Sequence, residues 1–332
     1  MKAAYITETG PPTNIQIGET PVPAIEPTTV LVKTAAVAVN PIDTYIRSGN
    51  VKLELPPKYI VGCDVAGTVE AIGDDVRHFK VGDRVWGSNQ GLAGRQGTFA
   101  EYCAIDEEWL YATPDSVSEL DAAAISLVGI TAHLGLFLHG NLQPDDVVFV
   151  NGGTGGVGSA VVQIAKASGA TVITTVGSNK KKELAQGLGA DIVINYREEN
   201  VAEVLNQRVA EVGGINLWFE TLRSPNPDLT IPLMAKRGRY VLMAGRDARP
   251  EFPVGAFYVN DLRAVGFAMF NASSDEQRES AEHLNALLVE GKLRPLIGAT
   301  LTLDEAAAAH QMQEDNTLAG HGTLSGKIVL TI

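Results

Sequence analysis

The chain has 332 residues, 45% hydrophobic and 20% charged, which is ordinary for a globular protein of about two domains. This composition excludes a disordered tail protein, a collagen and a coiled coil, and no apolar run is expected to approach the ~18–20 residues of a membrane span. The net charge of −13 disfavours broad nucleic-acid binding. Two cysteines, Cys63 and Cys103, cannot build a disulfide framework or a four-cysteine zinc site. Because the N-terminus has no signal-peptide core, we expect a cytoplasmic protein.

The first part of the chain, up to about residue 120, is predicted to be rich in β-strands. Short segments of Val, Ile and Thr are separated by turn signals such as Gly73-Asp74-Asp75 and Gly82-Asp83. Strands at this spacing favour a barrel or a sandwich. The predicted strands are Val30–Val39, Val61–Ile72, Arg84–Trp86 and Phe99–Ile105.

The pattern changes near Ser118, where a helical run at Glu119–Leu138 begins. From Val147 onward, apolar strands alternate with helices, and this alternation predicts a parallel sheet covered on both faces. The predicted strands are Val147–Val150, Thr171–Val176, Ile192–Asn195, Ile215–Phe219 and Arg239–Ala244. The predicted helices between them are Val157–Ser168, Lys181–Leu188, Glu198–Val212 and Asp228–Lys236. The tail adds helices at Asp275–Glu290 and Leu303–Gln313 and a strand at Lys327–Ile332.

A glycine-rich turn follows the strand Val147–Val150 and precedes a helix. Gly153, Gly155 and Gly158 fit the pattern G-x-G-x-x-G inside a strand–turn–helix unit, the context in which the pattern indicates a dinucleotide site. The glycines allow a tight turn, close approach of a pyrophosphate, and close helix packing. The helix N-terminus offers free N–H groups to the phosphates. The expected cofactor-binding residues here are Gly153, Thr154, Gly155, Gly156, Val157 and Gly158.

The end of the next strand predicts which dinucleotide binds. NAD sites usually carry a carboxylate about 20 residues past the glycines, but this chain has Ser178-Asn179 followed by three lysines, Lys180–Lys182. Hydroxyl, amide and ammonium donors attract a 2′-phosphate that a carboxylate would repel. Lysines at a helix N-terminus are unfavourable without an anion. The pattern therefore predicts NADP(H), bound in part by Ser178, Asn179 and Lys181.

With these motifs in place, the whole chain resembles the zinc-independent branch of the medium-chain dehydrogenase/reductase superfamily, and more closely the NADPH:quinone oxidoreductases of the zeta-crystallin group. Besides the glycine turn, the segments that carry the resemblance are Asn40–Gly49, Gly62–Val69, Val81–Val85, Gly97–Tyr102 and Gly326–Leu330.

The resemblance implies an α/β architecture with two domains. Residues 1–122, completed by 271–332, would form a GroES-like β-rich domain, and residues 123–270 a Rossmann domain with a doubly wound parallel sheet. The cofactor would lie in the cleft between them. The family commonly pairs through the edge of its Rossmann sheet, so we expect a homodimer, with the apolar strand Leu262–Phe270 as the edge.

The resemblance also assigns roles to individual residues. Asn40 and Tyr45 match the active-site pair beside the nicotinamide. Ser178, Lys181 and Tyr196 match positions that hold the 2′-phosphate and the adenosine end. The remaining cofactor positions implied are Gly245 and Arg246 at the nicotinamide ribose, Phe267 and Phe270 along the nicotinamide side, and Lys327 at a basic position near the cofactor.

A zinc alcohol dehydrogenase is the main rival within the superfamily. Catalytic zinc needs about three protein ligands of Cys, His or carboxylate type. The family's first cysteine ligand would fall near Asn40, and its Gly-His-Glu segment is replaced by Gly62-Cys63-Asp64. Only Cys63 and Asp64 could ligate a metal there, so no metal site is expected.

The function predicted from these features is reduction of a small-molecule quinone by NADPH through hydride transfer. Tyr45, together with Asn40, would bond the acceptor oxygen as it gains charge. The alternatives are a 2-alkenal or enone reductase on the same fold and, from another class, a non-catalytic crystallin-like or RNA-binding protein. Neither nucleic acid nor a membrane is an expected partner.

Overall fold

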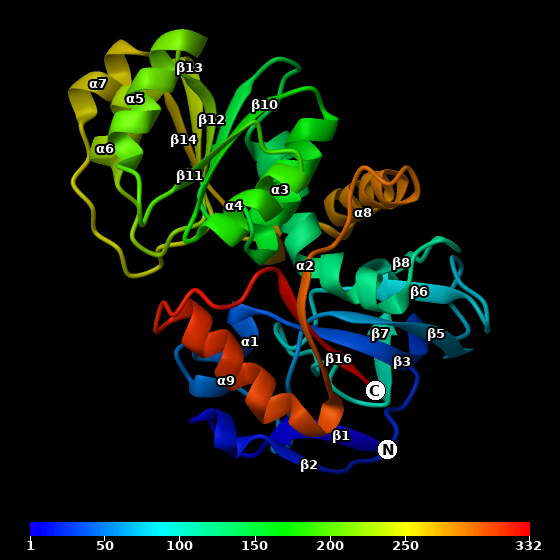
Figure 1. Ribbon diagram of the computed structural model, residues 1–332. Helices are drawn as coiled ribbons and strands as arrows, with labels where there is room; N and C mark the ends of the chain where they lie inside the picture. Colours follow the sequence, from blue (N-terminus) through cyan, green and yellow to red (C-terminus); the bar gives the residue numbers. More distant parts are fainter. The chain divides into compact units, whose positions relative to one another are not determined.

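The computed structural model describes residues 1–332 and divides into two compact units (Figure 1). The first unit comprises Met1–Leu127, Ser274–Val289 and Pro295–Ile332, and the second comprises Val128–Ser273 and Glu290–Arg294. The boundaries expected from the sequence, 122/123 and 270/271, lie a few residues from these. The sequence does not predict that Glu290–Arg294 joins the second unit.

The first unit contains two β-sheets. The larger sheet has seven strands in the order β15-β16-β3-β5-β6-β8, with β7 paired to β3 off this path, and the smaller has the order β2-β1-β4. All pairs are antiparallel except β15 with β16. The strands are β1 (Lys2–Ile6), β2 (Gln16–Glu19), β3 (Thr29–Val39), β4 (Tyr59–Ile60), β5 (Val65–Ile72), β6 (Arg84–Gly87), β7 (Tyr102–Asp106), β8 (Leu110–Ala112), β15 (Ile297–Thr302) and β16 (Lys327–Thr331).

The long strand β3 organises this unit, because it pairs with β5, β7 and β16. Its pairing with β16 brings the C-terminal strand beside the end of β3, where Ile328 lies opposite Val39. The helices of the unit are α1 (Pro41–Ser48), the first half of α2 (Glu119–Leu134), α8 (Ser274–Val289) and α9 (Ala306–Thr317). Helix α1 begins directly after β3, with Pro41 at its first position and Gly49 in the left-handed conformation at its end.

The second unit is a six-stranded parallel sheet in the order β11-β10-β9-β12-β13-β14. This is the doubly wound strand order with its reversal between β9 and β12, and the α/β fold class predicted from the sequence is confirmed. The strands are β9 (Val147–Val150), β10 (Thr171–Val176), β11 (Ile192–Asn195), β12 (Ile215–Glu220), β13 (Met234–Leu242) and β14 (Arg263–Gly266). The helices are α3 (Gly156–Ala167), α4 (Asn179–Gly187), α5 (Val201–Val212), α6 (Pro227–Leu233) and α7 (Val254–Val259).

Three predicted elements of the second unit are shorter than expected, and one of them, the helix predicted at Glu198–Val212, begins only at Val201. The helix predicted to reach Lys236 ends at Leu233, because Pro232 weakens it and Met234 pairs with Ile215 as the first residue of β13. The edge strand predicted at Leu262–Phe270 is confined to Arg263–Gly266, and a 3-10 turn follows at Met269–Asn271. Strand β14 nonetheless forms an edge of the sheet.

One helical stretch, Glu119–His139, passes a length and composition test for a membrane span, contrary to the expectation that no segment approaches one. It joins α2 to a π-helical turn at Gly135–His139. Of its most apolar window, 83% is buried inside the protein, as in the core helix of a soluble protein. Burial against protein explains its apolar character.

The core of the first unit encloses an unusual histidine. His310 of α9 is fully buried, neither ring nitrogen has a hydrogen-bond partner, and its ring meets the edge of Phe99 at a centroid distance of 5.9 Å. Burial, with a smaller contribution from the nearby Arg47, lowers the pKa of His310 to about 3. Arg47 is itself paired with Glu314 of the same helix.

The pKa of His310 in the folded protein lies below its ordinary value near 6.5. Below pH 6.5 the unfolded chain therefore binds a proton that the folded protein does not, so the stability that is fully present above pH 6.5 is lost as the pH falls toward 3. Between pH 7 and pH 5 the wild-type protein should therefore lose about 2 kcal/mol of unfolding free energy through this histidine. The His310→Leu variant should not show this loss. Urea unfolding at both pH values measures this. The exposed His78→Leu variant is the control and should show the same loss as wild type, and a pH-independent effect of His310→Leu would contradict the account.

Candidate functional site

The carboxyl ends of the parallel strands in the second unit carry most of the predicted cofactor residues. The segment Asn151–Gly158 follows β9 and runs into α3, whose N-cap is Gly155. Gly152 has a φ of 66°, a conformation that side-chain-bearing residues rarely adopt. The N-terminus of α3, with its unpaired N–H groups, therefore begins directly at the turn.

The three glycines of the motif meet different surroundings. A Cβ at Gly153 would lie 2.3 Å from Thr174 Oγ1, and one at Gly158 would lie 2.2 Å from the Gly152 carbonyl oxygen. At Gly155 the nearest atom would be the Gly152 oxygen at 3.2 Å, with nothing else within 4 Å. Packing therefore requires glycine at positions 153 and 158. At Gly155 the missing side chain leaves space for a ligand to approach the backbone. These residues fit a dinucleotide pyrophosphate.

A buried polar network holds the start of this turn across three neighbouring strands. Asn151 Nδ2 donates to Glu220 Oε1 at 3.2 Å, and Thr175 Oγ1 donates to Asn151 Oδ1 at 3.1 Å. The Gly152 N–H donates to Thr175 Oγ1 at 3.2 Å. Burial raises the pKa of Glu220, which also accepts from Trp218 Nε1. The network fixes the turn at the reversal of strand order, and the sequence analysis missed Glu220 and Thr175.

The residues predicted for the 2′-phosphate come together at the ends of β10 and β11. Ser178 is the N-cap of α4, and its Oγ accepts from the Lys181 N–H at 3.3 Å. Asn179 accepts from Asn195 Nδ2 at 2.9 Å. Tyr196 is half exposed, and its hydroxyl would lie 2.5 Å from a Cβ at Gly177. Glycine at position 177 therefore lets the tyrosine lie against this turn.

Two cations, Lys181 and Arg197, lie close together at the same place. Burial lowers the pKa of Lys181, and the nearby guanidinium of Arg197 lowers it further. Lys182 forms an ion pair with Glu199 at 2.9 Å. Two neighbouring cations repel each other unless an anion lies between them. The sequence analysis missed Arg197. Asn195 at the end of β11 pairs with Val176 at the end of β10, so a cation that follows β11 lies beside the residues that follow β10.

The remaining predicted cofactor residues follow β13 and β14. Gly245 has a φ of 84° and packs near Pro225, and Arg246 beside it is exposed. Phe267 stacks on His139 at 4.6 Å and meets Phe219 edge-on at 6.5 Å. Phe270 lies in the 3-10 turn and is partly buried.

In the first unit, Asn40 and Lys327 are part of one buried polar cluster. The Lys327 ammonium donates to the Val39 carbonyl oxygen at 2.7 Å and to Asn40 Oδ1, and it lies 3.6 Å from Asp64 Oδ2. Asn40 Nδ2 donates to the same Asp64 oxygen at 2.8 Å. Asn40 is 0% exposed and Lys327 is 5% exposed. The sequence names Asn40 and Lys327 as site residues but does not predict that they bond each other.

Tyr45 lies on α1, five residues after Asn40, and is partly exposed. The start of α1 is fixed by Asp43, whose Oδ2 accepts from the Asn40 N–H at 2.7 Å. Burial, with repulsion from Asp64, raises the pKa of Asp43 to about 7, and the Cys63 thiol beside it opposes this shift. Of the two predicted active-site residues, Tyr45 is the one that reaches the surface of the unit.

The residues around Asn40 do not fit a catalytic zinc. No group of three or more His, Cys, Asp or Glu side chains is arranged to hold a metal ion. Cys63 is fully buried beside Asp43, and Asp64 is already paired with an ammonium. Zinc binds thiolates, imidazoles and carboxylates, whereas Asn40 supplies an amide that is already bonded.

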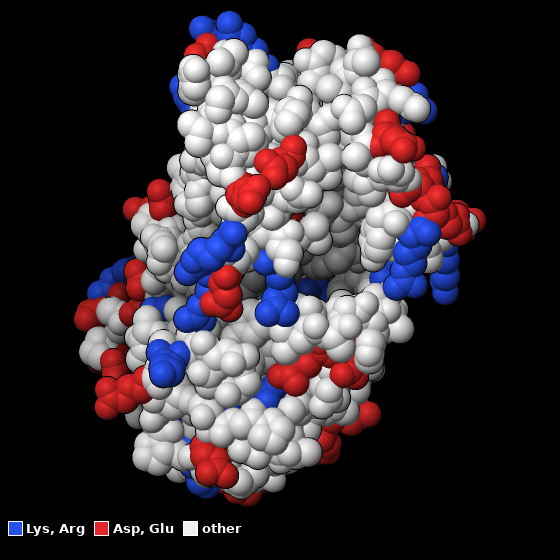
Figure 2. Space-filling model, turned by 90° about the vertical axis from the view of Figure 1, so that its left-hand side faces the viewer, with Lys and Arg blue, Asp and Glu red and all other residues white.

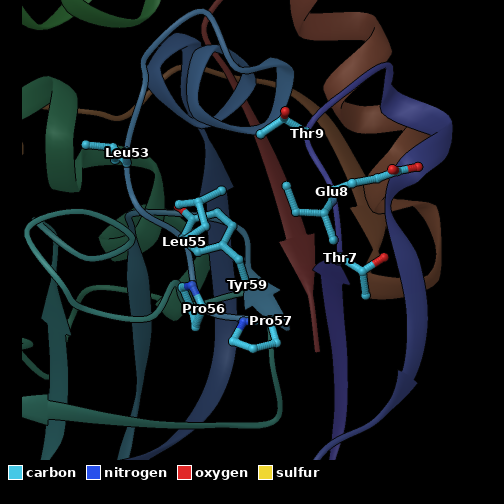
Figure 3. A pocket seen from close by; sticks show the side chains of 9 residues that line it. Thr7, Glu8, Thr9, Leu53, Leu55, Pro56, Pro57 and Tyr59 are labelled. Carbon is cyan, nitrogen blue, oxygen red and sulfur yellow. The ribbon is translucent and has the colours of Figure 1, made fainter.

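Two surface pockets of the first unit lie outside this cluster. One, of about 190 Å³, lies between residues 6–9 and residues 53–59 and is lined by Thr7, Glu8 and Thr9 and by the apolar Leu53, Leu55, Pro56 and Pro57 (Figure 3). The other, of about 340 Å³, is lined by residues from β4, β7 and the loop 90–98. Neither pocket is lined by Tyr45 or Asn40, so neither is a candidate for the reacting centre.

The surface charge of the protein is mixed. On the face drawn in Figure 2, acidic and basic side chains are interspersed among uncharged ones. With 39 acidic and 26 basic residues in all, the chain carries no excess of positive charge for phosphate backbones.

Comparison with known proteins gives matches along the chain. The model of the alcohol dehydrogenase GroES-like domain matches residues 26–115, and that of zinc-binding dehydrogenases matches residues 156–286. Human quinone oxidoreductase is 31% identical over 333 residues, covering 100% of this chain and 98% of that protein. A 2-methylene-furan-3-one reductase from Solanum lycopersicum is 30% identical, covering 93% of this chain and 73% of that protein.

Solved structures agree with these relatives. A mycobacterial quinone oxidoreductase has a TM-score of 0.86 at 30% identity, with 100% of both chains covered. A mycobacterial structure complexed with NADPH has a TM-score of 0.85 at 30% identity, again over 100% of both chains. The chain therefore belongs to the medium-chain dehydrogenase/reductase superfamily, in its quinone oxidoreductase group.

Proposed function

We propose that the protein reduces quinones with NADPH and without zinc. The observation that carries this proposal is the intact glycine turn together with the Lys181–Arg197 pair of cations at the ends of β10 and β11. The related quinone oxidoreductases and the NADPH complex of a mycobacterial neighbour support the class of reaction and the cofactor. Absence of a fitting metal site supports the proposal that the acceptor takes hydride unaided.

The second unit supplies the residues that would bind the cofactor. Gly155 and the start of α3 would receive the pyrophosphate, and Ser178, Lys181 and Arg197 the 2′-phosphate. Asn179, Tyr196, Gly245, Arg246, Phe267 and Phe270 remain proposed cofactor contacts. When bound, NADPH supplies a hydride, and the protein's contribution is orientation and electrostatics.

The first unit supplies the residue that would meet the acceptor. A quinone or enone oxygen gains negative charge as hydride arrives, and the Tyr45 phenol can donate a hydrogen bond to it. The side chain of Asn40 is committed to Asp64 and Lys327, so we assign Asn40 an indirect role. No positioned general acid is needed for a quinone, because the reduced product can take its proton from water.

Reduction of the C=C bond of an enone is the second candidate. The tomato 2-methylene-furan-3-one reductase and a 2-haloacrylate reductase structure with a TM-score of 0.83 at 28% identity favour it. Both acceptors need the same hydride donor and the same oxygen ligand. Rates with a quinone and an enone on the same preparation distinguish the two.

We predict that Lys181→Ala raises the KM for NADPH about 5–30-fold, the equivalent of one charge-assisted hydrogen bond of about 1–2 kcal/mol. The KM for NADH should change less than about twofold, since NADH lacks the 2′-phosphate. Lys180→Ala removes an exposed lysine from the same turn and should leave both constants unchanged. Equal effects of Lys181→Ala on both cofactors would show that this lysine does not bind the 2′-phosphate.

We predict that the wild-type protein oxidises NADPH with 1,4-benzoquinone and that Tyr45→Phe lowers kcat more than it raises KM. The expected loss is about 1–2 kcal/mol, or roughly 5–30-fold, and larger for an enone, which needs more polarisation. Tyr102→Phe, at a partly buried tyrosine of β7, serves as the control. If the Tyr45→Phe variant reduces both acceptors at rates within about twofold of wild type, Tyr45 only lines the site. If the wild-type protein shows no turnover at all, the proposed function is wrong.

We further propose that the protein is a homodimer formed through the β14 edge of the second unit. This edge strand leaves backbone groups unpaired, and α7 exposes Val254 (63%), Tyr258 (69%) and Val259 (63%). Exposed apolar side chains and an open sheet edge on one unit favour pairing with a second copy.

Sedimentation equilibrium at micromolar concentration should give twice the 35.2 kDa chain mass. Changing both Val254 and Val259 to Lys should shift the protein to monomer, because two buried charges are costly at an interface. Val81→Lys, at an exposed valine (62%) of the first unit, should leave the dimer intact. A wild-type mass of one chain would exclude the dimer.

A further inference from the structure

A charge pair is buried in the first unit where β16, β3 and β5 meet. Lys327 is the first residue of β16, and Asp64 directly precedes β5. The two side chains are 5% and 0% exposed, and Nζ lies 3.6 Å from Oδ2. Burial lowers the pKa of Lys327 and raises that of Asp64, while each group opposes the shift of the other. A buried pair of this kind persists only where the remaining protons and lone pairs are satisfied.

Every polar atom of the pair has a partner. The ammonium donates to the Val39 carbonyl oxygen and to Asn40 Oδ1, and it forms an ion pair with Asp64 Oδ2 at 3.6 Å. The other Asp64 oxygen accepts from Ser88 Oγ at 2.7 Å and from the Leu127 N–H at 3.1 Å. The cluster is therefore complete, and a complete buried network specifies one arrangement.

Asn40 is the residue on which this cluster acts. Its Oδ1 accepts from the ammonium and its Nδ2 donates to the carboxylate, so the amide has one allowed orientation. Asn40 is also the residue directly before α1, and Val39 ends β3. The ammonium thus binds the last residue of β3 and the N-cap residue of α1, and Tyr45 lies on that helix.

We propose that Lys327 is a positioning residue that acts as an internal cation: it fixes Asn40 and the start of α1, and thereby the placement of Tyr45 toward the acceptor. This role replaces the cofactor contact that the sequence suggested for Lys327. The effect of Lys327 on turnover through Tyr45 rests on the proposed function, whereas its effect on Asn40 and α1 does not. It also explains why a metal does not fit, since a divalent ion beside Asp64 would meet the positive charge already there.

The test compares three variants. Lys327→Met leaves the Asp64 carboxylate buried without a counter-charge and should lower Tm. Asp64→Asn combined with Lys327→Met removes both charges and should recover most of the lost Tm while leaving Asn40 without its ammonium. Lys33→Met, at an exposed lysine of β3, is the matched control and should behave as wild type.

The double variant should bind NADPH, followed by nicotinamide fluorescence, with a Kd within about twofold of wild type. Its kcat with benzoquinone should fall about tenfold, the equivalent of 1.4 kcal/mol. Adding Tyr45→Phe to the double variant should cause little further loss, because both changes remove the same contribution. If Lys327 had only a structural role, its loss would lower Tm, and the effects of the double variant and of Tyr45→Phe on kcat would simply add.

A readout without turnover separates this proposal from the proposed function. In protein labelled with fluorotyrosine, the ¹⁹F signal lost in Tyr45→Phe identifies Tyr45 among the eight tyrosines. That signal should shift or broaden in the double variant and stay unchanged in Lys33→Met. An unchanged Tyr45 signal, or a tenfold weaker Kd for NADPH with kcat preserved, would overturn the proposal. Wild-type protein without turnover but with the expected ¹⁹F change would refute only the function.

Discussion

A lysine ammonium enclosed by protein requires an acceptor for each of its protons and a nearby negative charge. Lys327 donates to Val39 and Asn40 and pairs with the carboxylate of Asp64. The pairing of β16 with β3 brings residue 327 to the end of β3, and the strand that follows Asp64 pairs with β3 as well. Three segments far apart in the sequence are therefore held by one charge, at the place where α1 begins.

The second unit depends on a different constraint, the common direction of its strands. Because all six strands are parallel, their carboxyl ends lie on one edge of the sheet, and the residues that follow them share that edge. The glycine turn, Ser178, Tyr196, Gly245 and Phe267 each follow a different strand. The polar contacts of Asn151 with Glu220 and Thr175 fix the turn at the reversal of strand order. In the proposed function, the second unit would bind the dinucleotide and the first would meet the acceptor.

Sequence reasoning predicts what local patterns determine. Strands β9, β10 and β11 have the predicted bounds, because each is a short apolar run that ends at Asn or is followed by Asn or Gly. It misses the short strands β1, β2, β4 and β8 and the strand β15, and it extends α6 past Pro232 into residues that β13 uses. It finds the glycine turn and the lysines, since each motif is contiguous. It misses Arg197, Glu220 and the bond between Asn40 and Lys327, because those contacts exist only once strands have paired.

A protein cation, and no set of metal ligands, occupies the polar cluster beside α1, and the enzyme we propose passes hydride from NADPH to its acceptor without zinc. Independence from zinc is tested by measuring the oxidation of NADPH by benzoquinone before and after exhaustive chelation, with the zinc content of both preparations determined by elemental analysis. We expect the same rate in both preparations, with zinc far below one atom per chain. A rate that disappears with the removal of stoichiometric zinc and returns when zinc is restored would contradict it.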